Sequence, residues 1–466
     1  ALHVRLADTA LALDASGPAA YLEIAAVVAA ARDSGCAAIH PGYGFLSERA
    51  DFAAACNAVG LVFIGASAEH LALFGDKARA RALALQHEVP LLPGTGAASL
   101  EQVQGFLAEQ RKAHPGCGVM LKAVAGGGGR GMRAVFDAAA LPEAFARCSS
   151  EARAAFGGGA VYAERLIERA RHIEIQLLGD GAEVVSFGER ECTLQRRFQK
   201  LVEIAPSPTL DAGLRERITA CALRLARAVG YRGLGTFEFL LDTDSGEFFF
   251  IEVNPRLQVE HTVTEEVTGV DLVQAQIAVA AGASLASLGL GTAPPPRGFA
   301  VQWRINAETF DEAGHARPAS GRITRLEWPS GPGVRIDTHA LAGATPSPHY
   351  DTLLAKLIVS HRANSFAEVL RRSQRALGEC RIDGLATNLP LLQTLAADPA
   401  LAANELYTRW LEQQWPRLQA QLAAARPSGE ASSAAETAAE IAAENEPGAD
   451  PAALEVGACL VALPTP

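Results

Sequence analysis

Two glutamates, Glu238 and Glu252, have the residue type and spacing of a pair that binds a divalent cation. They lie in "GTFEFLLDTDSGEFFFIEVN", where two alternating apolar runs flank residues 244–246. A three-residue hairpin loop with glycine in the left-handed position is a common connection between strands. In that register Leu241 pairs with Phe249, and Glu238 lies directly opposite Glu252. Opposed residues have Cβ atoms about 5 Å apart, where like charges repel, and a bound cation would reverse that repulsion.

The other ligand types nearby indicate which cation such a site would hold. Asn254 follows Glu252 by two residues and therefore lies on the same face of the strand. Two carboxylates and an amide, with no histidine or cysteine nearby, suit Mg²⁺ or Mn²⁺ rather than Zn²⁺. The alternative is a solvated strand face, which explains less well why the acids alternate with phenylalanine.

A glycine run in "KAVAGGGGRGMRAV", which begins at Lys122, indicates a loop that handles phosphates. Gly126, Gly128 and Gly131 match the dinucleotide pattern G-x-G-x-x-G, but a Rossmann loop or a P-loop must open into a helix. Here the glycines precede an alternating, strand-like segment. We therefore expect a strand–loop–strand hairpin that closes over phosphates as a lid, with a plain flexible hairpin as the alternative. A lid and a carboxylate pair together suit ATP-dependent ligation, in which metals bridge the nucleotide phosphates.

The elements that would position these groups divide the chain into several units. Helix-like and strand-like segments alternate at the start, which predicts a parallel sheet. "TAPPPRG" is a proline-rich break before a second, α+β unit, and after Arg426 no basic residue remains, which is typical of a flexible linker. The expected units are an N-terminal one over 1–76, a central one over 77–290 with its lid at about 93–165, a C-terminal domain over 291–415, a linker over 416–452, and the possible first strand of a further module over 453–466.

Length and composition limit the classes of function. A chain of 466 residues predicts two or three domains. The formal net charge of −11 argues against a nucleic-acid partner. No apolar run reaches the ~20 residues of a bilayer span, and no secretory signal begins the sequence, so we expect no membrane partner. The eight cysteines are scattered without a C-x-x-C pair, which favours reduced thiols and a cytoplasmic location.

Eight segments, taken in order from about residue 1 to 415, resemble biotin carboxylase, the module shared by acyl-CoA carboxylases and pyruvate carboxylase. They are "HPGYGFLSE", "GDK", "KAVAGGGGRGM", "ERLIERARHIEIQ", "ERECTLQRRFQK", "GTFEFLL", "FIEVNPRLQVEHTVTE" and "YDTLLAKL". The resemblance implies an ATP-grasp fold of the α/β and α+β classes. It would comprise an N-terminal parallel-sheet subdomain without the family's first β-α-β, roughly 40 residues, a glycine-loop lid and a biotin carboxylase C-terminal subdomain.

The resemblance also implies a reaction and the residues that carry it. ATP would activate bicarbonate to carboxyphosphate, and the carboxyl group would pass to N1′ of biotin. The nucleotide would be bound by Lys77, Lys122, Gly128, Gly129, Glu164, Arg165, Leu166, Ile167, His172 and Gln195, of which residues 164–167 form a hinge that presents backbone groups to adenine. The metal would be bound by Glu238, Glu252 and Asn254.

For bicarbonate, the resemblance implies a pocket of Lys200, Arg256, Gln258 and Val259. Glu260 would be the base that deprotonates bicarbonate, and Arg304 would stabilise the enolate of biotin. If "RLQVE" is extended, Arg256, Gln258 and Glu260 share one face at intervals of about 6.6 Å. Cations beside Glu260 would lower its pKa. The alternative for Glu260 is a structural ion pair with Arg256.

The sequence departs from the family pattern at named positions. Phe198 stands where the family commonly has histidine, and Thr262 stands where proline usually follows the histidine of "EHPVTE". No "AMKM"-like biotinylation site is present, so biotin would be carried by another chain or by a C-terminal module. The expected partners are therefore bicarbonate, a biotin carrier domain and a carboxyltransferase, and the resemblance implies a homodimer.

Two other functions remain open at this point. Another bicarbonate-using ATP-grasp ligase, such as the large subunit of carbamoyl-phosphate synthase, shares the metal carboxylates, although "NPRLQVEH" and "YDTLLAKL" favour biotin. An inactive chain that only docks subunits is the other alternative, and the retained acids and lysines argue against it.

Overall fold

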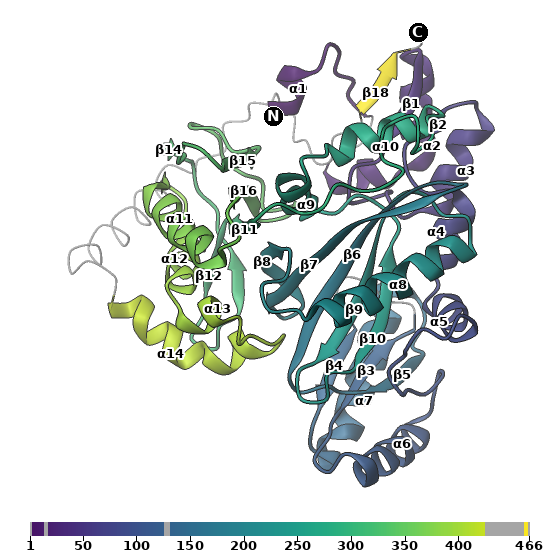
Figure 1. Ribbon diagram of the computed structural model, residues 1–466, viewed down its shortest axis with the longest axis vertical. Helices are drawn as coiled ribbons and strands as arrows, with labels where there is room; N and C mark the ends of the chain where they lie inside the picture. The colour runs from purple at the N-terminus through teal and green to yellow at the C-terminus, as the bar shows by residue number, and fades with distance from the viewer. Residues whose placement is uncertain (1, 14–16, 125–130, 425–460, 465–466) are drawn as a thin grey trace, which may run out of the picture.

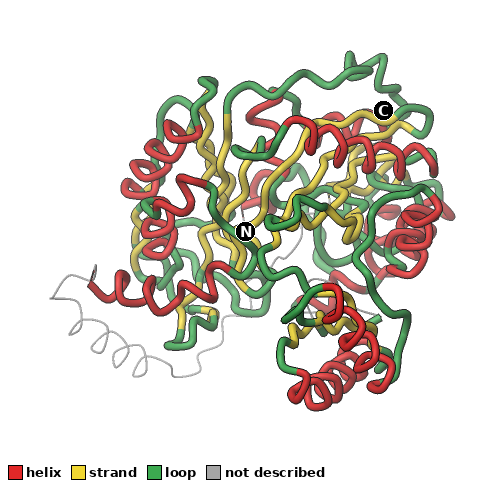
Figure 2. Tube along the Cα trace, turned by 60° about the horizontal axis from the view of Figure 1, so that its bottom comes forward, coloured by secondary structure: helices red, strands yellow, loops and turns green. Residues whose placement is uncertain are grey.

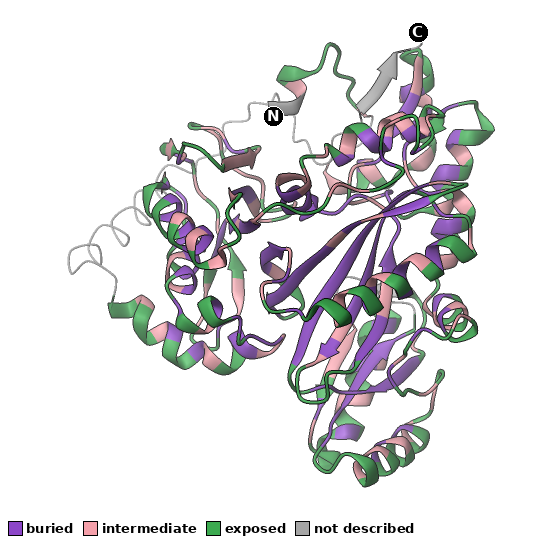
Figure 3. Cartoon of the chain, viewed as in Figure 1, coloured by how far each residue is buried: buried purple, intermediate pink, exposed green. Residues whose placement is uncertain are grey.

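An eight-stranded antiparallel sheet is the centre of the molecule (Figure 1). The computed structural model describes residues 2–13, 17–124, 131–424 and 461–464. The inner strands are buried along most of their length (Figure 3). In their order across the sheet, the strands are β10 (Phe248–Asn254), β9 (Arg232–Asp242), β6 (Ala170–Asp180), β7 (Val184–Arg196), β8 (Gln199–Ala205), β11 (Phe299–Asn306), β16 (Leu353–His361) and β15 (Val334–Thr338).

The sheet crosses the domain boundary expected near residue 290. β8, from the central unit, pairs with β11, from the C-terminal unit, and Glu203 lies opposite Gln302. The proline-rich break precedes β11 but does not interrupt the sheet. Side chains of the C-terminal unit therefore lie directly beside those of the central unit.

The N-terminal unit contains the expected parallel pair, β1 (Cys36–His40) and β2 (Val62–Phe63). A third strand, β18 (Val461–Pro464), pairs antiparallel with the other edge of β1, so part of the segment expected to begin a further module joins the N-terminal sheet. The apolar core of this unit continues into the central sheet. The helices that complete these two units are α1 (Leu2–Leu6), η1 (Pro18–Leu22), α2 (Ile24–Asp33), α3 (Ala50–Ala58), α4 (Ala68–Phe74), α5 (Lys77–Gln86), α8 (Ala212–Ala228), α9 (His261–Thr268) and α10 (Leu272–Ala280).

The segment expected as the lid forms a small α/β lobe with its own core, at the bottom of Figure 1 and toward the viewer in Figure 2. The two strands predicted on either side of the glycine run are confirmed, because Lys122 pairs with Met132 across an antiparallel ladder. Gly128 and Gly129 lie outside the described residues. The elements of this lobe are α6 (Leu100–Ala113), β3 (Val119–Ala123), β4 (Met132–Val135), η2 (Ala138–Ala140), α7 (Leu141–Phe156) and β5 (Val161–Arg165).

The hairpin of β9 and β10 confirms the main prediction and corrects its turn. Glu238 lies opposite Glu252. The strands end at Asp242 and begin again at Phe248, so the connection is longer than three residues and Leu241 pairs with Phe248 rather than Phe249. An irregularity between Phe250 and Glu252 shifts the register by one residue, which restores the predicted apposition of the two acids.

The C-terminal unit covers one end of the sheet with helices (Figure 1). Its last helix continues to Ala424, beyond the linker boundary expected at residue 416. The boundary was wrong because Leu418 is fully buried in the core of this unit, so the helix has a packed face there. The remaining elements are β12 (Glu308–Phe310), β13 (Ala316–Pro318), β14 (Arg325–Glu327), α11 (Phe366–Glu379), β17 (Arg381–Asp383), α12 (Leu389–Ala396), α13 (Pro399–Ala403) and α14 (Trp410–Ala424).

Buried Arg–Glu pairs hold neighbouring strands of the central sheet together. Arg171 on β6 donates to both carboxylate oxygens of Glu191 on β7, at 2.8 and 2.6 Å. Ser207 and Asn404 donate to the same carboxylate, at 2.7 and 3.0 Å. Both members of this pair are buried, and neither Arg171 nor Glu191 belongs to the predicted site residues, so we interpret the pair as structural.

Candidate active site

A single ammonium group, that of Lys200, lies among three carboxylates from three different elements. Its Nζ donates to Glu174 on β6 at 2.6 Å, to Glu238 on β9 at 3.1 Å and to Glu260 at 2.6 Å. Burial opposes protonation of this amine, but the three carboxylates outweigh it and raise the pKa of Lys200 well above its usual range. Lys200 therefore joins β6, β9 and the start of α9 in one buried cluster of charges.

Glu260 is held between two cations, as predicted, but one of them is a different residue. It lies at the N-terminal end of α9, where Lys200 binds one carboxylate oxygen and the Arg304 guanidinium donates to the other at 2.9 Å. Burial acts against ionisation, yet Lys200 and Arg304 prevail and hold the pKa of Glu260 below its ordinary value. The predicted direction of that shift is confirmed. Arg304 also donates to Glu203 at 2.5 Å, which fixes the plane of its guanidinium.

Arg256 does not lie on one face with Glu260, as an extended "RLQVE" would require. β10 ends at Asn254, and the residues that follow turn into α9. The Arg256 guanidinium donates to the Glu48 carboxylate and, at 3.2 Å, to Asn254 Oδ1. The alternative of an Arg256–Glu260 ion pair is therefore wrong.

The two carboxylates of the predicted metal pair have opposite electrostatic surroundings. Burial and the neighbouring charge of Glu238 raise the pKa of Glu252, which has Lys77 Nζ at 3.8 Å. Burial also disfavours ionised Glu238, but Lys200 and His172 dominate and hold its pKa well below the usual range. A divalent cation beside both oxygens would relieve the repulsion that raises the pKa of Glu252. The donor set therefore fits Mg²⁺ or Mn²⁺.

Asn254 and Gln258 both donate to the carboxylate of Glu238. The two amide nitrogens lie at 2.8 and 3.2 Å from its Oε1. Asn254 Oδ1 accepts from Arg256, so ligation by Asn254 would need that oxygen to turn toward the acid pair.

His172 lies against the acid pair, which corrects the expectation that no histidine is near. Its Nε2 is 2.9 Å from Glu238 Oε2, and its Nδ1 is 2.9 Å from Gln195 Nε2. Gln195 Nε2 also donates to the Cys192 carbonyl at 2.8 Å, which fixes the orientation of the amide. Because this amide donates to Nδ1, the ring proton is on Nε2 and donates to Glu238. In that tautomer His172 is a hydrogen-bond donor rather than a metal ligand.

The predicted nucleotide residues lie where the lid meets the central unit, and several are paired with each other. Lys122 Nζ donates to Glu164, which also accepts from Arg81 at 2.6 Å. The backbone N–H groups of Arg165 and Leu166 donate to Pro93 and Gly118 carbonyls, at 2.9 and 3.0 Å. These two N–H groups are thus committed within the protein, and the role of residues 164–167 as a hinge that presents backbone groups to adenine stays a prediction.

The side chains of Arg165 and Ile167 are also committed to contacts within the protein. Arg165 contacts His114 and stacks on the Phe249 ring, and Ile167 packs against Leu92 and Phe249 in a small apolar cluster.

The backbone of Val259, from the predicted bicarbonate pocket, accepts a hydrogen bond at 3.0 Å from the Lys356 ammonium.

Sequence reasoning missed several charged residues of this centre. Glu174 and Arg190 are fully buried, as is Glu203, and Lys356 is nearly so. A signal existed for Glu174, because a glutamate inside the apolar run "HIEIQLL" needs a buried partner. No sequence pattern indicates which partner it has.

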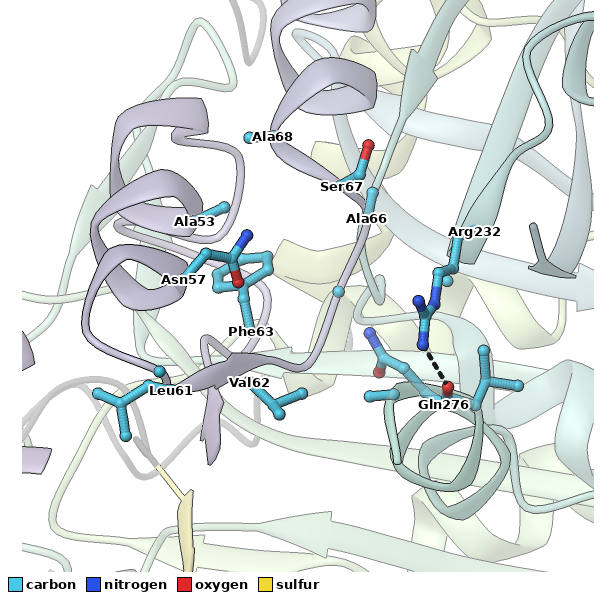
Figure 4. Close-up of a pocket in the computed structure, with 15 residues that line it drawn as sticks. Ala53, Asn57, Leu61, Val62, Phe63, Ala66, Ser67, Ala68, Arg232 and Gln276 are labelled. Carbon is cyan, nitrogen blue, oxygen red and sulfur yellow. Dashed lines mark hydrogen bonds between the residues drawn. The ribbon is translucent and has the colours of Figure 1, made fainter. Parts of the chain in front are cut away.

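A separate hollow of about 380 Å³ lies away from these charges, between α3, β2 and α10 (Figure 4). Arg232, at its edge, donates to the Val279 carbonyl at 2.9 Å, and none of the lining residues is acidic. This hollow does not offer the groups needed to bind a metal nucleotide.

Comparison with known proteins assigns the chain to a family. The N-terminal domain of biotin carboxylase matches residues 1–71, and the C-terminal domain of biotin carboxylase matches residues 302–413. Between them, the ATP-binding domain of the carbamoyl-phosphate synthase L chain matches residues 76–288. The biotin carboxylase domain of a single-chain bacterial carboxylase is 48% identical, covers 91% of this chain and 90% of its own, and superposes with a TM-score of 0.79. The chain belongs to the biotin carboxylase family.

Other relatives extend the comparison. Pyruvate carboxylase 1 of Caenorhabditis elegans is 44% identical over the whole of this chain, and the pyruvate carboxylase of Aspergillus niger is 44% identical over 88% of it. The chain spans between a third and two fifths of the length of these curated relatives. The biotin carboxylase domain of the Hydrogenobacter thermophilus 2-oxoglutarate carboxylase, solved as a dimer with MgADP and bicarbonate, is 38% identical, covers 89% of this chain and 90% of its own, and has a TM-score of 0.82.

The ATP-grasp fold expected from the sequence is confirmed by these matches. They also decide between the two ligases left open above, because biotin carboxylase domains flank the shared ATP-binding domain. In the described part of the chain, no helix has the length and apolar content of a membrane span.

The residue at position 262, where this chain departs from the family pattern, has a structural partner. Thr262 is fully buried in the first turn of α9, and its hydroxyl donates to Gln302 Oε1. Gln302 in turn donates to Glu203 at 2.9 Å, and Glu203 accepts from Arg304. Thr262 is therefore connected, through Gln302 and Glu203, to Arg304 of the site.

We expect Thr262→Pro to destabilise the protein by about 1–3 kcal/mol, the cost of a buried acceptor left without its donor. Proline itself is tolerated in the first turn of a helix. Urea unfolding of both proteins measures the difference. Thr262→Val keeps the side-chain shape and separates loss of the hydroxyl from the backbone effect of proline. If both variants unfold at the wild-type urea concentration, Thr262 does not hold Gln302.

Proposed function

We propose that this chain catalyses the ATP- and bicarbonate-dependent carboxylation of biotin at N1′. The observation that carries the proposal is the placement of Glu260 between Lys200 and Arg304, at 2.6 and 2.9 Å. A carboxylate base beside two cations suits an anionic substrate that must lose a second proton. The same cations would stabilise the dianion that results.

The low pKa of Glu260 in this structure is compatible with a role as base. Both of its oxygens accept hydrogen bonds from cations, and these bonds lower its basicity. Bicarbonate bound beside Lys200 would share that cation, so Glu260 would become more basic and the bicarbonate O–H more acidic. The proton would then pass from the bicarbonate oxygen to a Glu260 carboxylate oxygen. Arg304, released from Glu260, would donate to the oxygen of biotin as it gains charge.

Glu238 and Glu252 would hold the Mg²⁺, whose chemistry is to bridge and neutralise the phosphates of ATP. Lys77, which lies 3.8 Å from Glu252, is placed to add positive charge at those phosphates. Lys122 would have to exchange Glu164 for a phosphate oxygen. His172, with its tautomer fixed by Gln195, would keep Glu238 oriented. Gly128 and Gly129 would close over the phosphates from the lid, and residues 164–167 would present backbone groups to adenine.

The partners of the reaction follow from the same proposal. A biotin carrier domain would present biotin at Arg304, and a carboxyltransferase would consume the product. Multi-domain relatives support this, among them a single-chain long-chain acyl-CoA carboxylase that is 40% identical over 91% of this chain, with 40% of its own length covered and a TM-score of 0.78. The Hydrogenobacter domain dimer supports a homodimer. The acyl-CoA acceptor stays a prediction, since relatives also include pyruvate carboxylases, and so does the cytoplasmic location, since the mouse relative is mitochondrial.

The test is ATP hydrolysis by the purified 466-residue chain with Mg²⁺, measured with and without bicarbonate and free biotin. We expect hydrolysis that requires bicarbonate and rises with biotin, accompanied by carboxybiotin. Dependence on ammonia instead of biotin would indicate a carbamoyl-phosphate type of ligase. Absence of turnover in a folded chain would favour the docking role.

A further inference from the structure

Arg190 is a fully buried residue of β7 whose guanidinium contacts five side chains. Its Nε donates to Glu174 Oε1 at 2.5 Å. The other contacts made by its N–H groups reach Gln176 at 2.7 Å, Thr264 at 3.0 Å, Thr236 at 3.0 Å and Gln258 at 3.1 Å. A guanidinium has five N–H donors in a rigid plane, and here the five donors have five acceptors. The group can satisfy all of them only in this one orientation.

The contact with Gln258 determines which end of its amide faces the site. The guanidinium of Arg190 has no acceptor, so only the amide oxygen of Gln258 can pair with it. The ionised carboxylate of Glu238 has no donor, so only the amide nitrogen can pair with it, and does so at 3.2 Å. The two neighbours together leave one orientation, with the NH₂ group on the side of Glu238 and Lys200. This is the donor that an anion beside Lys200 requires.

The contact of Arg190 with Glu174 affects Lys200, the second group that would bind the anion. Arg190 takes one oxygen of that carboxylate, and Lys200 takes the other at 2.6 Å. The side-chain exposures of Arg190 and Glu174 are both 0%, so neither can turn toward water instead. The position of the Lys200 ammonium is thus set by a carboxylate that Arg190 holds in place. One buried residue is connected to both sides of the anion pocket.

We propose that Arg190 is a positioning residue for the anionic substrate, which orients Gln258 and, through Glu174, Lys200. This inference rests on the proposed function, because it names the bicarbonate pocket as the site that is ordered. Arg190 itself contacts no substrate and takes part in no bond change. Its effect is expected on bicarbonate affinity, while the nucleotide contacts of Lys77 and Lys122 remain unchanged.

The experiment compares Arg190→Lys and Arg190→Gln with the wild-type chain in bicarbonate-dependent ATP hydrolysis. Lysine keeps the positive charge next to Glu174 but cannot reach Glu174 and Gln258 together, and glutamine removes the charge. We expect KM for bicarbonate to rise at least 10-fold in either variant, with KM for ATP within about 3-fold of wild type. Glu174 and Gln258 would still be present but no longer fixed, so the change should fall on one substrate only.

Arg171→Lys and Arg171→Gln are matched controls, because Arg171 is also a buried arginine paired with a buried glutamate on β6 and β7. A loss of stability alone would appear in these variants as a lower melting temperature, with both KM values unchanged. Combining Arg190→Gln with Gln258→Leu adds a second readout: if Arg190 acts through Gln258, the double variant should raise KM for bicarbonate less than the product of the two single changes.

Each outcome bears on the inference. Equal increases of both KM values, or no change in either, would overturn it. It would also be overturned if both Arg190 variants fail to fold under conditions in which the Arg171 variants fold, because the role would then be structural. If the wild-type chain shows no bicarbonate- and biotin-dependent hydrolysis, the proposed function itself is wrong. The wild-type assay alone shows this, so the two failures can be distinguished.

Discussion

Glu260→Gln should lower kcat for bicarbonate-dependent ATP hydrolysis by about 10²–10⁴-fold, the usual contribution of a general base. Glutamine keeps the shape and one acceptor oxygen but cannot take a proton. Removing the carboxylate charge leaves Lys200 and Arg304 with a smaller counter-charge. Glu260 is not among the residues predicted to bind the nucleotide, so KM for ATP should change little. Steady-state kinetics at saturating bicarbonate measure both values.

Glu189→Gln is the matched control for this substitution. Glu189 lies on β7 and is also nearly fully buried, but it pairs with Arg215 at 2.7 Å and with the Ser207 N–H group, and has no contact with the acidic centre. Its kcat should stay within about 3-fold of wild type. If Glu260→Gln keeps more than a tenth of wild-type turnover, the base is a different residue.

Glu252→Gln should reduce turnover by at least about 100-fold, because loss of a direct metal ligand exceeds the 10–100-fold typical of residues behind the ligands. The fold should survive. Burial and the charge of Glu238 raise the pKa of Glu252, so neutralising it relieves repulsion in the metal-free hairpin. The melting temperature without Mg²⁺ should therefore equal or exceed that of the wild type.

The measurement is turnover as a function of Mg²⁺ concentration, together with the melting temperature with and without MgATP. Glu247→Gln changes an exposed glutamate in the turn of the same hairpin and should leave both readouts as in the wild type. A Glu252→Gln variant with wild-type Mg²⁺ dependence would show that the acid pair does not bind the metal.

Sequence reasoning succeeded where a local period determines the geometry. The alternation in "GTFEFLL" and "FFFIEVN" places Glu238 opposite Glu252, although the turn between them is longer than expected. The extension of that period through Arg256 to Glu260 failed, because the strand ends at Asn254 and the chain turns into α9. Periodicity predicts which face a residue occupies only while the strand continues.

Contacts between distant segments could not be predicted in this way. The three carboxylates around Lys200 lie 26, 38 and 60 residues from it, on two strands and at the start of a helix. The contact of Arg304 with Glu203 depends on the pairing of β8 with β11, which the proline-rich break gave no reason to expect. The family resemblance implied the site residues Lys200, Arg304, Glu238 and Glu260. Glu174 and Glu203, which also bind Lys200 and Arg304, became apparent only in the structure.

The pairing of β8 with β11 also limits which parts of the molecule can open independently. Separation of the C-terminal unit would break the ladder between residues 202–205 and 300–303, in the middle of the eight-stranded sheet. Within the described residues, no strand of the lid joins that sheet. Amide protons of β8 and β11 should therefore exchange with solvent together, in the most protected class, whereas those of β3, β4 and β5 exchange through a lower-energy opening. A nucleotide would then enter by local opening of the lid, while the anion pocket on the eight-stranded sheet keeps its shape.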